Sequence, residues 1–348
     1  MDQPEVKRAV ACPDKFRGTL SAAAAADAMA RGLRTAGFDV VRTVPLADGG
    51  EGTLDALVAA RGGSRRVESV TGPLGAPLDA EWALLSDGTA VVEMAAASGL
   101  ALVEGDFDPL RASTRGTGQL IAAAARSGAR RIVVGVGGSA TTDGGLAAVE
   151  ALGWSLAGLE VTVACDVSTP FVDAARVFAP QKGATPAQVA LLERRLQRLA
   201  GMYEARTGVN VTALEGAGAA GGLAGGLAAI GATLEPGFDV VARAAGLELE
   251  LDDAQLVVTG EGKLDATSFD GKVVGGVLDW AGDQGVGHLA VIAGQVTDDA
   301  REELSVRANV QVLALTDRVW SAGEAFVRAA LLVEEAAVEA GHLALGIV

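Results

Sequence analysis

Cysteine, histidine and aromatic residues are scarce in this chain. Its 348 residues include two cysteines and two histidines, and aromatic residues make up 4% of the sequence. Cys12 and Cys165 each lie at the end of an apolar run, which favours buried free thiols in a reducing compartment. His288 and His342 lie far apart and have no neighbouring cysteine or histidine partners in the sequence. The sequence therefore argues against a structural zinc site.

The chain also lacks a basic excess and long apolar runs. It has 28 Lys and Arg residues against 44 Asp and Glu residues, a formal net charge of −16, whereas a nucleic-acid surface requires a basic face. No apolar run reaches the roughly 20 residues that span a bilayer. Residues 1–8 are charged and lack the apolar centre of a signal peptide. We therefore expect a soluble cytoplasmic protein without nucleic-acid or membrane partners.

Several well-known catalytic signatures are missing. The chain contains no G-x-x-x-x-G-K-[ST] loop, no H-R-D and D-F-G pair, and no G-x-S-x-G elbow. Ser139 has no histidine near it in the sequence. These absences argue against a Walker-type NTPase, a protein kinase and a serine hydrolase.

The order of apolar patterns predicts an α/β protein with two domains. Half of the residues are hydrophobic, and 348 residues exceed a typical single core. Strand-length apolar runs alternate with helical patterns near both chain ends, which predicts one parallel sheet that both ends build. Short alternating runs between residues 66 and 94 predict antiparallel strands, with a hairpin turn at 86–88. We place a domain boundary near residue 65.

Two apolar segments allow alternative interpretations. Residues 215–226 consist largely of Gly and Ala and fit either a flexible linker or the start of a tightly packed helix. The apolar residues on both sides favour the helix. The Ala- and Leu-rich face of residues 329–337 fits either the core or a homodimer surface, and we favour the core.

The central motif lies in residues 131–145. The apolar run Ile132–Val136 predicts a buried parallel strand, and it ends in Gly137, Gly138 and Ser139, with Asp143 close behind. A helical pattern follows. Glycines let the backbone approach a ligand, and the first amides of a helix lack intrahelical partners and carry partial positive charge. The segment therefore predicts a phosphate-binding turn.

The same construction recurs along the chain: a strand end that carries a carboxylate, glycines and often Lys or Arg. In parallel sheets, ligands bind beyond the carboxyl ends of the strands. Phosphoryl transfer needs carboxylates for Mg²⁺ and for the proton of the attacking hydroxyl, and amides and cations for the transferring group. The alternative is that these residues only form turns and caps. The construction occurs at Asp14–Lys15, Asp48–Glu51, Ser139–Asp143, Asp166 and Glu261–Lys263–Asp265.

An NAD-dependent dehydrogenase is a less favoured alternative. Gly135–Ala140 and Gly216–Gly221 both fit the dinucleotide fingerprint G-x-G-x-x-[G/A]. With 47 glycines in the chain, chance matches are expected. Asp166 ends the next predicted strand, but it follows Ala140 by about 26 residues, whereas the fingerprint expects an acidic residue about 20 residues after the glycines.

Nine stretches together form a pattern over nearly the whole chain: Pro13–Ser21, Leu46–Gly52, Glu93–Leu100, Thr117–Ile121, Gly135–Gly145, Ala164–Val167, Pro180–Thr185, Gly216–Gly222 and Thr259–Asp265. In content and order, these stretches resemble the bacterial type I glycerate kinases. The resemblance implies ATP-dependent phosphorylation of D-glycerate, usually at the 2-hydroxyl, with Mg²⁺. It also implies an interdomain cleft between a flavodoxin-like (Rossmann-like) domain, residues 1–65 plus 285–348, and an inserted mixed-sheet α/β domain, residues 66–284, that carries the glycine-rich loops.

The turns and the resemblance together give a set of expected site residues. The catalytic candidates are Asp166, Asp265, Lys182 and Lys263. The candidates for the nucleotide are Gly137, Gly138, Ser139, Asp143, Gly260, Glu261 and Lys272. The candidates for glycerate are Asp14, Lys15, Arg17, Asp48 and Glu51. Asp143, Asp166 and Asp265 are also the candidates for Mg²⁺, and the sequence does not separate metal ligand from proton acceptor.

Departures from the family pattern keep a second function class open. The segment around residues 153–161 is shorter than usual, and Thr169–Phe171 stands where the family usually has Asn-Pro-Leu. Thr142 also stands where the family usually has Asn. A non-catalytic or altered-specificity relative, which binds nucleotide or another hydroxy acid, is therefore the alternative to a glycerate kinase. A homodimer is a further expectation.

Overall fold

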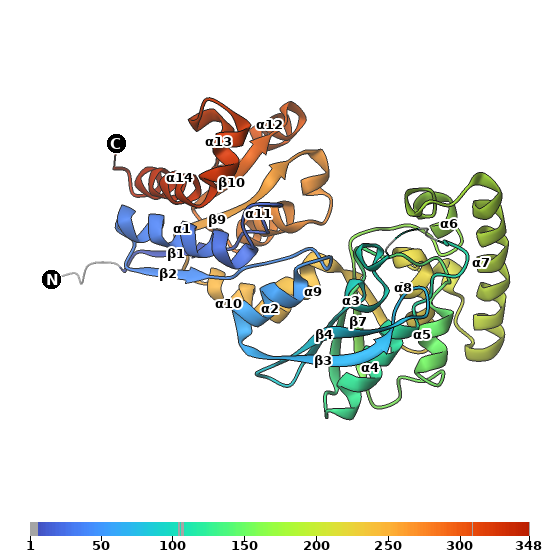
Figure 1. Ribbon diagram of the computed structural model, residues 1–348. Coiled ribbons are helices and arrows are strands. Elements are labelled where there is room, and N and C mark those ends of the chain that lie inside the picture. The colour runs from blue at the N-terminus through green and yellow to red at the C-terminus, as the bar shows by residue number, and fades with distance from the viewer. Residues whose placement is uncertain (1–5, 104, 106–107, 308, 348) are drawn as a thin grey trace. The chain divides into compact units, whose positions relative to one another are not determined.

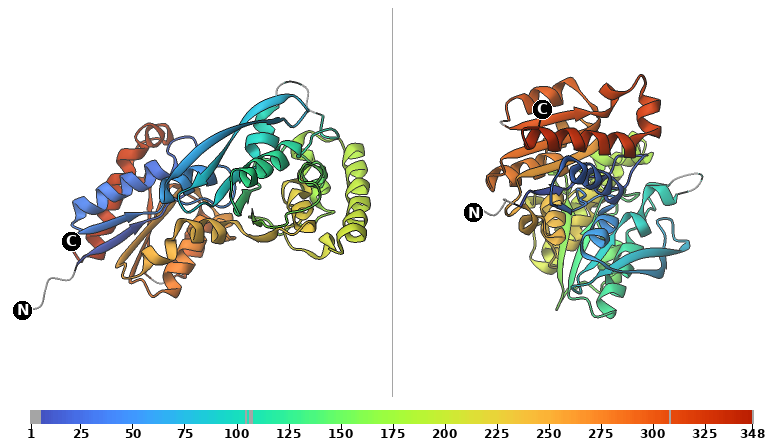
Figure 2. Two further views of the ribbon diagram at one scale, coloured as in Figure 1. Left: turned by 90° about the horizontal axis from the view of Figure 1, so that it is seen from below. Right: turned by 90° about the vertical axis from the view of Figure 1, so that its left-hand side faces the viewer.

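The computed structural model describes residues 6–103, 105, 108–307 and 309–347, and it has two compact units (Figures 1 and 2). Unit 1 comprises Met1–Asp48, Asp55–Ala60 and Val241–Val348, and unit 2 comprises Gly49–Leu54 and Arg61–Val240. Both chain ends therefore belong to unit 1. No helix in the described part of the chain has both the length and the apolar character needed to cross a membrane.

Unit 1 contains a five-stranded, wholly parallel sheet in the order β11-β10-β9-β1-β2. Counted along this unit, the strand order is 2-1-3-4-5, the flavodoxin-like order, in which ligands bind at the switch point between the first and third strands. That switch point lies between β1 and β9. The strands are β1 (Arg8–Ala11), β2 (Val40–Thr43), β9 (Leu256–Leu264), β10 (His288–Val296) and β11 (Val310–Ala314).

Two helices, α1 (Ala22–Ala36) and α14 (Ala329–Ala344), lie side by side against one face of this sheet (Figure 1). Ser21 caps α1 by accepting a hydrogen bond from the Ala24 amide, and Gly37 ends the helix with a φ of 106°. A serine N-cap and a left-handed glycine after the last turn are common helix ends. The buried positions of α14 belong to the core cluster, which confirms the expected core packing of residues 329–337.

The opposite face of the sheet is also buried. Val257 of β9 and Val291 of β10 are at most 1% exposed, and α11 (Val273–Asp283) contacts both strands. Burial on both faces is typical of parallel sheets. The remaining helical elements with residues in unit 1 are α2 (Thr53–Arg61), α9 (Gly237–Ala245), α10 (Leu247–Leu251), η4 (Ala266–Phe269), α12 (Asp298–Ser305), η5 (Leu315–Arg318) and α13 (Ala322–Val327).

Unit 2 contains a mixed six-stranded sheet in the order β3-β4-β5-β6-β7-β8. The pairs β3–β4 and β4–β5 are antiparallel, as the alternating runs between residues 66 and 94 predict, and the other pairs are parallel. The strands are β3 (Gly63–Thr71), β4 (Pro77–Leu85), β5 (Ala90–Glu93), β6 (Arg131–Gly135), β7 (Glu160–Cys165) and β8 (Thr233–Pro236).

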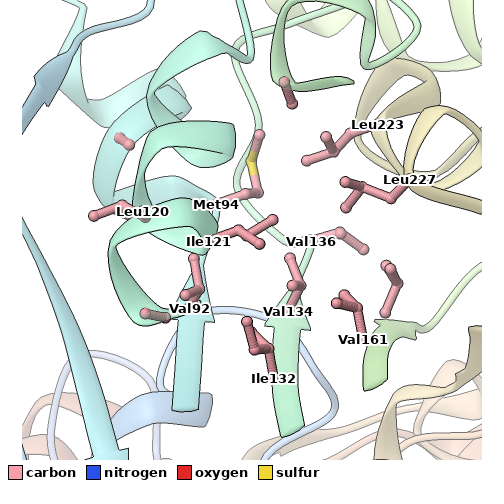
Figure 3. Close-up of a cluster of buried hydrophobic side chains, with 14 of the residues drawn as sticks. Val92, Met94, Leu120, Ile121, Ile132, Val134, Val136, Val161, Leu223 and Leu227 are labelled. Carbon is pink, nitrogen blue, oxygen red and sulfur yellow. The ribbon is translucent and has the colours of Figure 1, made fainter. Parts of the chain in front are cut away.

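The main core of unit 2 lies between this sheet and two helices, α4 (Arg115–Arg126) and α8 (Ala219–Ala229), as Figure 3 shows. Val134 and Val161 from the sheet pack with Ile121 of α4 and Leu223 of α8. A second cluster surrounds Tyr203. The other helical elements are α3 (Ala95–Ser98), η1 (Leu100–Leu102), α5 (Leu146–Ala151), α6 (Ala174–Phe178), η2 (Pro180–Lys182), α7 (Pro186–Thr207) and η3 (Val211–Ala213).

The α/β class, with a parallel sheet and a separate mixed sheet, is confirmed. The boundary of the compact units differs from the expected one. We expected the inserted segment to run to residue 284, but unit 2 ends at Val240, because β9 pairs with β1 and β10 and brings α11 with it. Residues 219–229 form a fully buried helical segment, which confirms packing over a flexible linker.

Candidate active site

The glycine-rich turn after β6 is held by backbone hydrogen bonds inside unit 2. The Leu100 amide donates to Gly138 O at 2.9 Å, and the Ala140 amide donates to Ser98 O at 3.0 Å. Gly137 packs directly on the loop at residue 50, since a Cβ at Gly137 would lie 2.7 Å from Gly50 Cα. We expected these glycines to make room for a ligand. At Gly137, the space is needed by the protein's own backbone.

The turn also offers backbone amides that could bind an anion, those of Gly137, Gly138 and Ser139. Within the described part of the chain, none of these three amides donates a backbone hydrogen bond outside helices and strands. Lys182, at the end of η2, directs its ammonium group to the same turn: Nζ donates to Ser139 Oγ at 2.7 Å and to Thr141 O at 2.6 Å. The structure therefore brings the catalytic candidate Lys182 to the turn that carries the nucleotide candidates Gly137, Gly138 and Ser139.

The environment of Lys182 is unusual for a charged side chain. The residue is 3% exposed, and both of its hydrogen-bond acceptors are neutral oxygens. Burial lowers the pKa of Lys182 to about 8, although the charge of nearby Asp143 acts in the opposite direction. A buried charge is costly without a counter-charge. A phosphate at the turn would supply one.

Asp143 fastens the segment that follows the turn. Its Oδ2 accepts hydrogen bonds from the Thr114 amide and from Thr114 Oγ1, both at 2.9 Å, and its Oδ1 accepts one from the Gly145 amide at 3.1 Å. Burial raises the pKa of Asp143, while these hydrogen bonds act to lower it. A cation at Asp143 would compete with these donors. The helix that follows, α5, has only six residues, so we assign no phosphate site to its N-terminus.

Three further residues complete the description of unit 2. Asp166 directly follows β7 and is exposed. Glu51 lies beside the turn, because a Cβ at Gly137 would be 3.3 Å from the Glu51 amide.

Glu93 was not among the expected site residues, yet its Oε1 accepts hydrogen bonds from the Gly52 and Leu54 amides at 2.9 Å each. Glu93 thus fixes the loop that covers the turn, and its place in a family-like stretch was the available signal.

In unit 1, Asp14 and Glu261 lie at the β1/β9 switch point. The Asp14 amide donates to Gly260 O at 2.9 Å, and Asp14 Oδ1 accepts from the Lys15 amide at 2.6 Å. Desolvation is the main cause that raises the pKa of Asp14 to about 6 and that of Glu261 to about 7, and the charge of Asp14 further raises the pKa of Glu261. Carboxyl groups that ionise near neutral pH are typical of functional sites.

Neighbouring charges surround this carboxylate pair. Lys15 and Lys272 act to lower the pKa of Asp14, and Asp48 acts to raise it. Arg17 is exposed, and its backbone packs on the next strand, since a Cβ at Gly262 would lie 2.9 Å from the Arg17 amide. The predicted substrate residues of unit 1 therefore gather at one sheet edge. Gly260 lacks a side chain for a packing reason, because a Cβ there would meet the Ile292 carbonyl.

Asp265 has a different environment from Glu261. It caps η4, and its Oδ1 accepts hydrogen bonds from Thr267 Oγ1 at 2.7 Å and from the Thr267 amide at 3.1 Å. Lys263 Nζ lies 3.8 Å from Asp265 Oδ2, and Lys272 Nζ donates to Thr267 Oγ1 at 2.9 Å. The Thr267 hydroxyl leads the causes that lower the pKa of Asp265. Asp265 is therefore a half-buried carboxylate whose hydrogen bonds favour the ionised form.

The carboxylates suit a magnesium ion that is bound together with phosphate. No group of three or more His, Cys, Asp or Glu side chains in the described ranges is arranged to hold a metal by itself. Mg²⁺ usually keeps several waters and takes one or two protein carboxylates besides substrate phosphates. Asp265 and Asp166, which are both accessible, fit this donor chemistry.

Comparisons with known proteins identify the relatives of this chain. The model of the glycerate kinase family matches residues 9–158 and 154–345. The chain belongs to the glycerate kinase family. The family's glycerate 2-kinase from Escherichia coli (strain K12) is 42% identical over 329 residues, an alignment that covers 83% of this chain and 86% of that protein.

Other relatives extend the match over nearly the whole chain. The glycerate kinase of Halalkalibacterium halodurans is 38% identical, with 94% of this chain and 96% of the relative covered. The crystal structure of a Salmonella typhimurium LT2 protein assigned as glycerate kinase 2 matches with a TM-score of 0.86 and 35% identity, over 98% of this chain and 99% of that one. The expected family is therefore confirmed, and the chain is an enzyme of the glycerate kinase family.

Proposed function

We propose that this chain is an ATP-dependent kinase that phosphorylates D-glycerate at the 2-hydroxyl with Mg²⁺. One observation carries the phosphate part of the proposal: the buried ammonium of Lys182 lies behind a turn with three available amides and has two neutral oxygens as its partners. The 2-hydroxyl is chosen because the Escherichia coli relative is named glycerate 2-kinase.

Each unit supplies part of the chemistry in this proposal. In unit 2, Gly137, Gly138, Ser139 and Lys182 bind the phosphates of the nucleotide. Amides and a cation neutralise the charge of a transferring phosphoryl group. In unit 1, the cations Lys15, Arg17 and Lys272 bind the carboxylate of glycerate.

The proton of the attacking hydroxyl goes to a carboxylate of the β1/β9 switch point. Asp14 and Glu261, with pKa values raised to about 6 and about 7, are matched to proton transfer near neutral pH. Asp265, whose pKa is lowered, is a weaker proton acceptor. We therefore propose Asp14 or Glu261 as the base, and we keep Asp166 and Asp265 as the predicted ligands of Mg²⁺; Asp143, the third predicted ligand, is instead occupied by its hydrogen bonds from Thr114 and Gly145. The ion would neutralise phosphate charge.

A coupled assay of ADP release tests the proposal. Purified protein receives ATP, Mg²⁺ and one of a panel of hydroxy acids, and proton-coupled ³¹P NMR of the product identifies the site of phosphorylation. A phosphate on the 2-hydroxyl couples to one proton and gives a doublet, whereas a phosphate on the 3-hydroxyl couples to two protons and gives a triplet. A triplet contradicts the 2-hydroxyl assignment. Nucleotide binding without turnover on any hydroxy acid favours the non-catalytic relative.

Three carboxylate variants test the roles. Asp14→Asn should lower kcat and kcat/KM together, because a base acts in the transition state. Asp166→Asn and Asp265→Asn should raise the Mg²⁺ concentration needed for half-maximal rate. If both of the latter variants keep wild-type turnover at every Mg²⁺ concentration, the assignment of the metal ligands fails. The homodimer and the cytoplasmic location stay predictions, and sedimentation equilibrium measures the first.

A further inference from the structure

A cavity of about 370 Å³ lies inside unit 2, next to the glycine-rich turn. Thr142, Asp143, Leu146 and Ala147, which directly continue the turn, form one wall. Leucines 192, 196 and 199 of α7 line it from another side. Its volume lies within the range of about 300–1,000 Å³ that small-molecule sites occupy, and mainly apolar walls with a few polar groups are typical of such sites.

Thr142 supplies an independent indication of a ligand. The residue is 3% exposed, and its Oγ1 is buried without a hydrogen-bond partner in the described part of the chain. Nearly all buried polar side-chain atoms in proteins have a partner, so an unpaired hydroxyl requires an explanation. A ligand in the cavity that Thr142 lines would provide the missing partner.

The position and the chemistry of the cavity select the kind of ligand. We propose that it binds the nucleoside part of ATP, with the base against the leucines and the hydrogen-bonding groups of the base or ribose at Thr142. This inference rests on the proposed kinase function. Only two residues separate Ser139, at the phosphate turn, from Thr142, at the cavity wall, so one continuous segment serves both ends of the nucleotide.

The two other components of the reaction fit the cavity poorly. D-Glycerate is a small polar acid that gains little from leucine walls, because burial stabilises in proportion to apolar area. Inorganic phosphate would meet two cations of the lining, Arg111 and Arg195, but it would leave the leucine wall without an apolar partner. Polar side chains do lie at the cavity: Glu150 and Arg195 are exposed, and Arg195 Nη1 donates to Leu110 O at 3.0 Å, which ties α7 to the segment at residue 110. Glu150 offers an acceptor for ribose hydroxyls.

Filling the cavity tests the inference. Ala147→Phe places a ring in the cavity, whereas Ala151→Phe, one turn further along α5 and outside the lining, is the matched control. Calorimetry measures binding of ADP, adenosine and tripolyphosphate to each protein. We expect Ala147→Phe to weaken ADP and adenosine at least 30-fold and to leave tripolyphosphate within 3-fold of wild type. Ala151→Phe should bind all three probes as wild type does.

A second pair of variants, at Thr142, changes the hydroxyl group without filling the cavity, so its result does not depend on how the core tolerates an added ring. Thr142→Val removes the hydroxyl at nearly constant shape and should weaken adenosine 5- to 10-fold, whereas Thr142→Ser should stay within 2-fold of wild type. Wild-type affinity of both Ala147→Phe and Thr142→Val for ADP overturns the inference. Loss of tripolyphosphate binding together with ADP in Ala147→Phe overturns it as well, since that result means a disturbed turn.

The binding readout separates this inference from the proposed function. If the wild-type protein binds adenosine in the cavity but releases no ADP with any hydroxy acid, the kinase proposal fails and the nucleoside site stands. If Ala147→Phe keeps the wild-type KM for ATP in a working kinase reaction, the kinase stands and the nucleoside site is overturned.

Discussion

Replacing Lys182 by methionine tests the phosphate-binding turn most directly. Methionine keeps much of the apolar stem of lysine but removes the charge that faces Ser139 and Thr141. A hydrogen bond from a charged group to phosphate contributes about 2–3 kcal/mol, so affinity for tripolyphosphate should fall roughly 30- to 150-fold. Affinity for adenosine should not change, because adenosine carries no phosphate.

The stability of the protein should change little at pH 7. A pKa of about 8, against 10.5 for an unperturbed lysine, means that burial of the charged form of Lys182 costs about 3 kcal/mol. Lys182→Met removes this cost, but it leaves Ser139 Oγ and Thr141 O without their donor, at about 1–3 kcal/mol together. The two effects nearly cancel, and we expect a free energy of unfolding within about 2 kcal/mol of wild type.

The pH dependence has a definite sign. The pKa of Lys182 is lower in the folded protein than in the unfolded chain, so between about pH 8 and 10.5 the unfolded chain binds more protons. Wild-type stability relative to Lys182→Met should therefore rise with pH, by about 2 kcal/mol between pH 7 and 9.5. Well below pH 8, Lys182 is charged in the folded protein, and the full cost of burying its charge lowers the free energy of unfolding.

Urea unfolding at pH 7 and pH 9.5, together with calorimetry of tripolyphosphate binding, measures these quantities. Lys7→Met, a substitution of the same kind in the segment before β1, is the matched control. It should reproduce wild type in both experiments. A stability difference between wild type and Lys182→Met that is independent of pH would refute the buried charge. Unchanged binding of tripolyphosphate to Lys182→Met would refute its role at the phosphate.

Three other predictions use separate measurements. If Glu261 rather than Asp14 is the base, it must be ionised to accept the proton, and its pKa is raised to about 7. In that case kcat/KM should fall below pH 7 in wild type, and Glu261→Gln should lose that limb of the pH–rate profile. Tyr203→Phe removes the hydrogen bond to Gly144 O and should lower the free energy of unfolding by about 1–2 kcal/mol in urea titrations, with little change in the KM for ATP. Gly221→Ala should destabilise by at least about 2 kcal/mol, because φ is +68° and the Cβ would meet the Thr141 carbonyl. Gly201→Ala, on the exposed side of α7, should instead stabilise by about 0.5–1 kcal/mol; equal effects of the two glycine variants would contradict this reasoning.

The sheet content was predictable from the sequence because the strands carry simple local patterns. β6 is a continuous apolar run, β4 alternates, and both were located from this periodicity. The boundary near residue 285 was not reliable for a physical reason. Which sheet β9 joins depends on its pairing with β1, some 250 residues earlier in the chain, and local patterns carry no information about such pairing.

The site residues also divide into those that local sequence patterns indicated and those that depend on contacts formed only in the folded chain. Sequence patterns predicted the turn and Lys182, because glycines and a lone lysine after Pro180 stand in recognisable motifs, and the structure places the two in contact. They missed Thr114, whose amide and hydroxyl both bind Asp143 across 29 positions. They also gave no sign of the unpaired hydroxyl of Thr142, since the absence of a partner is a property of the folded environment.

The neighbours Glu261 and Asp265 show why the sequence could not assign the proton acceptor. Both are carboxylates in one glycine-containing stretch after a strand, and both were candidates on equal grounds. In the structure, Glu261 is largely desolvated beside Asp14, so its pKa rises, whereas Asp265 accepts hydrogen bonds from the Thr267 hydroxyl and amide, so its pKa falls. Hydrogen bonds and solvent stabilise the ionised form, and burial beside another carboxylate destabilises it. A proton acceptor near neutral pH needs the buried environment of Glu261, whereas a helix cap or a magnesium ligand needs the hydrogen-bonded environment of Asp265. Glu261 and Asp265 lie only four positions apart in the sequence, yet their surroundings suit one to proton transfer and the other to capping or binding a cation.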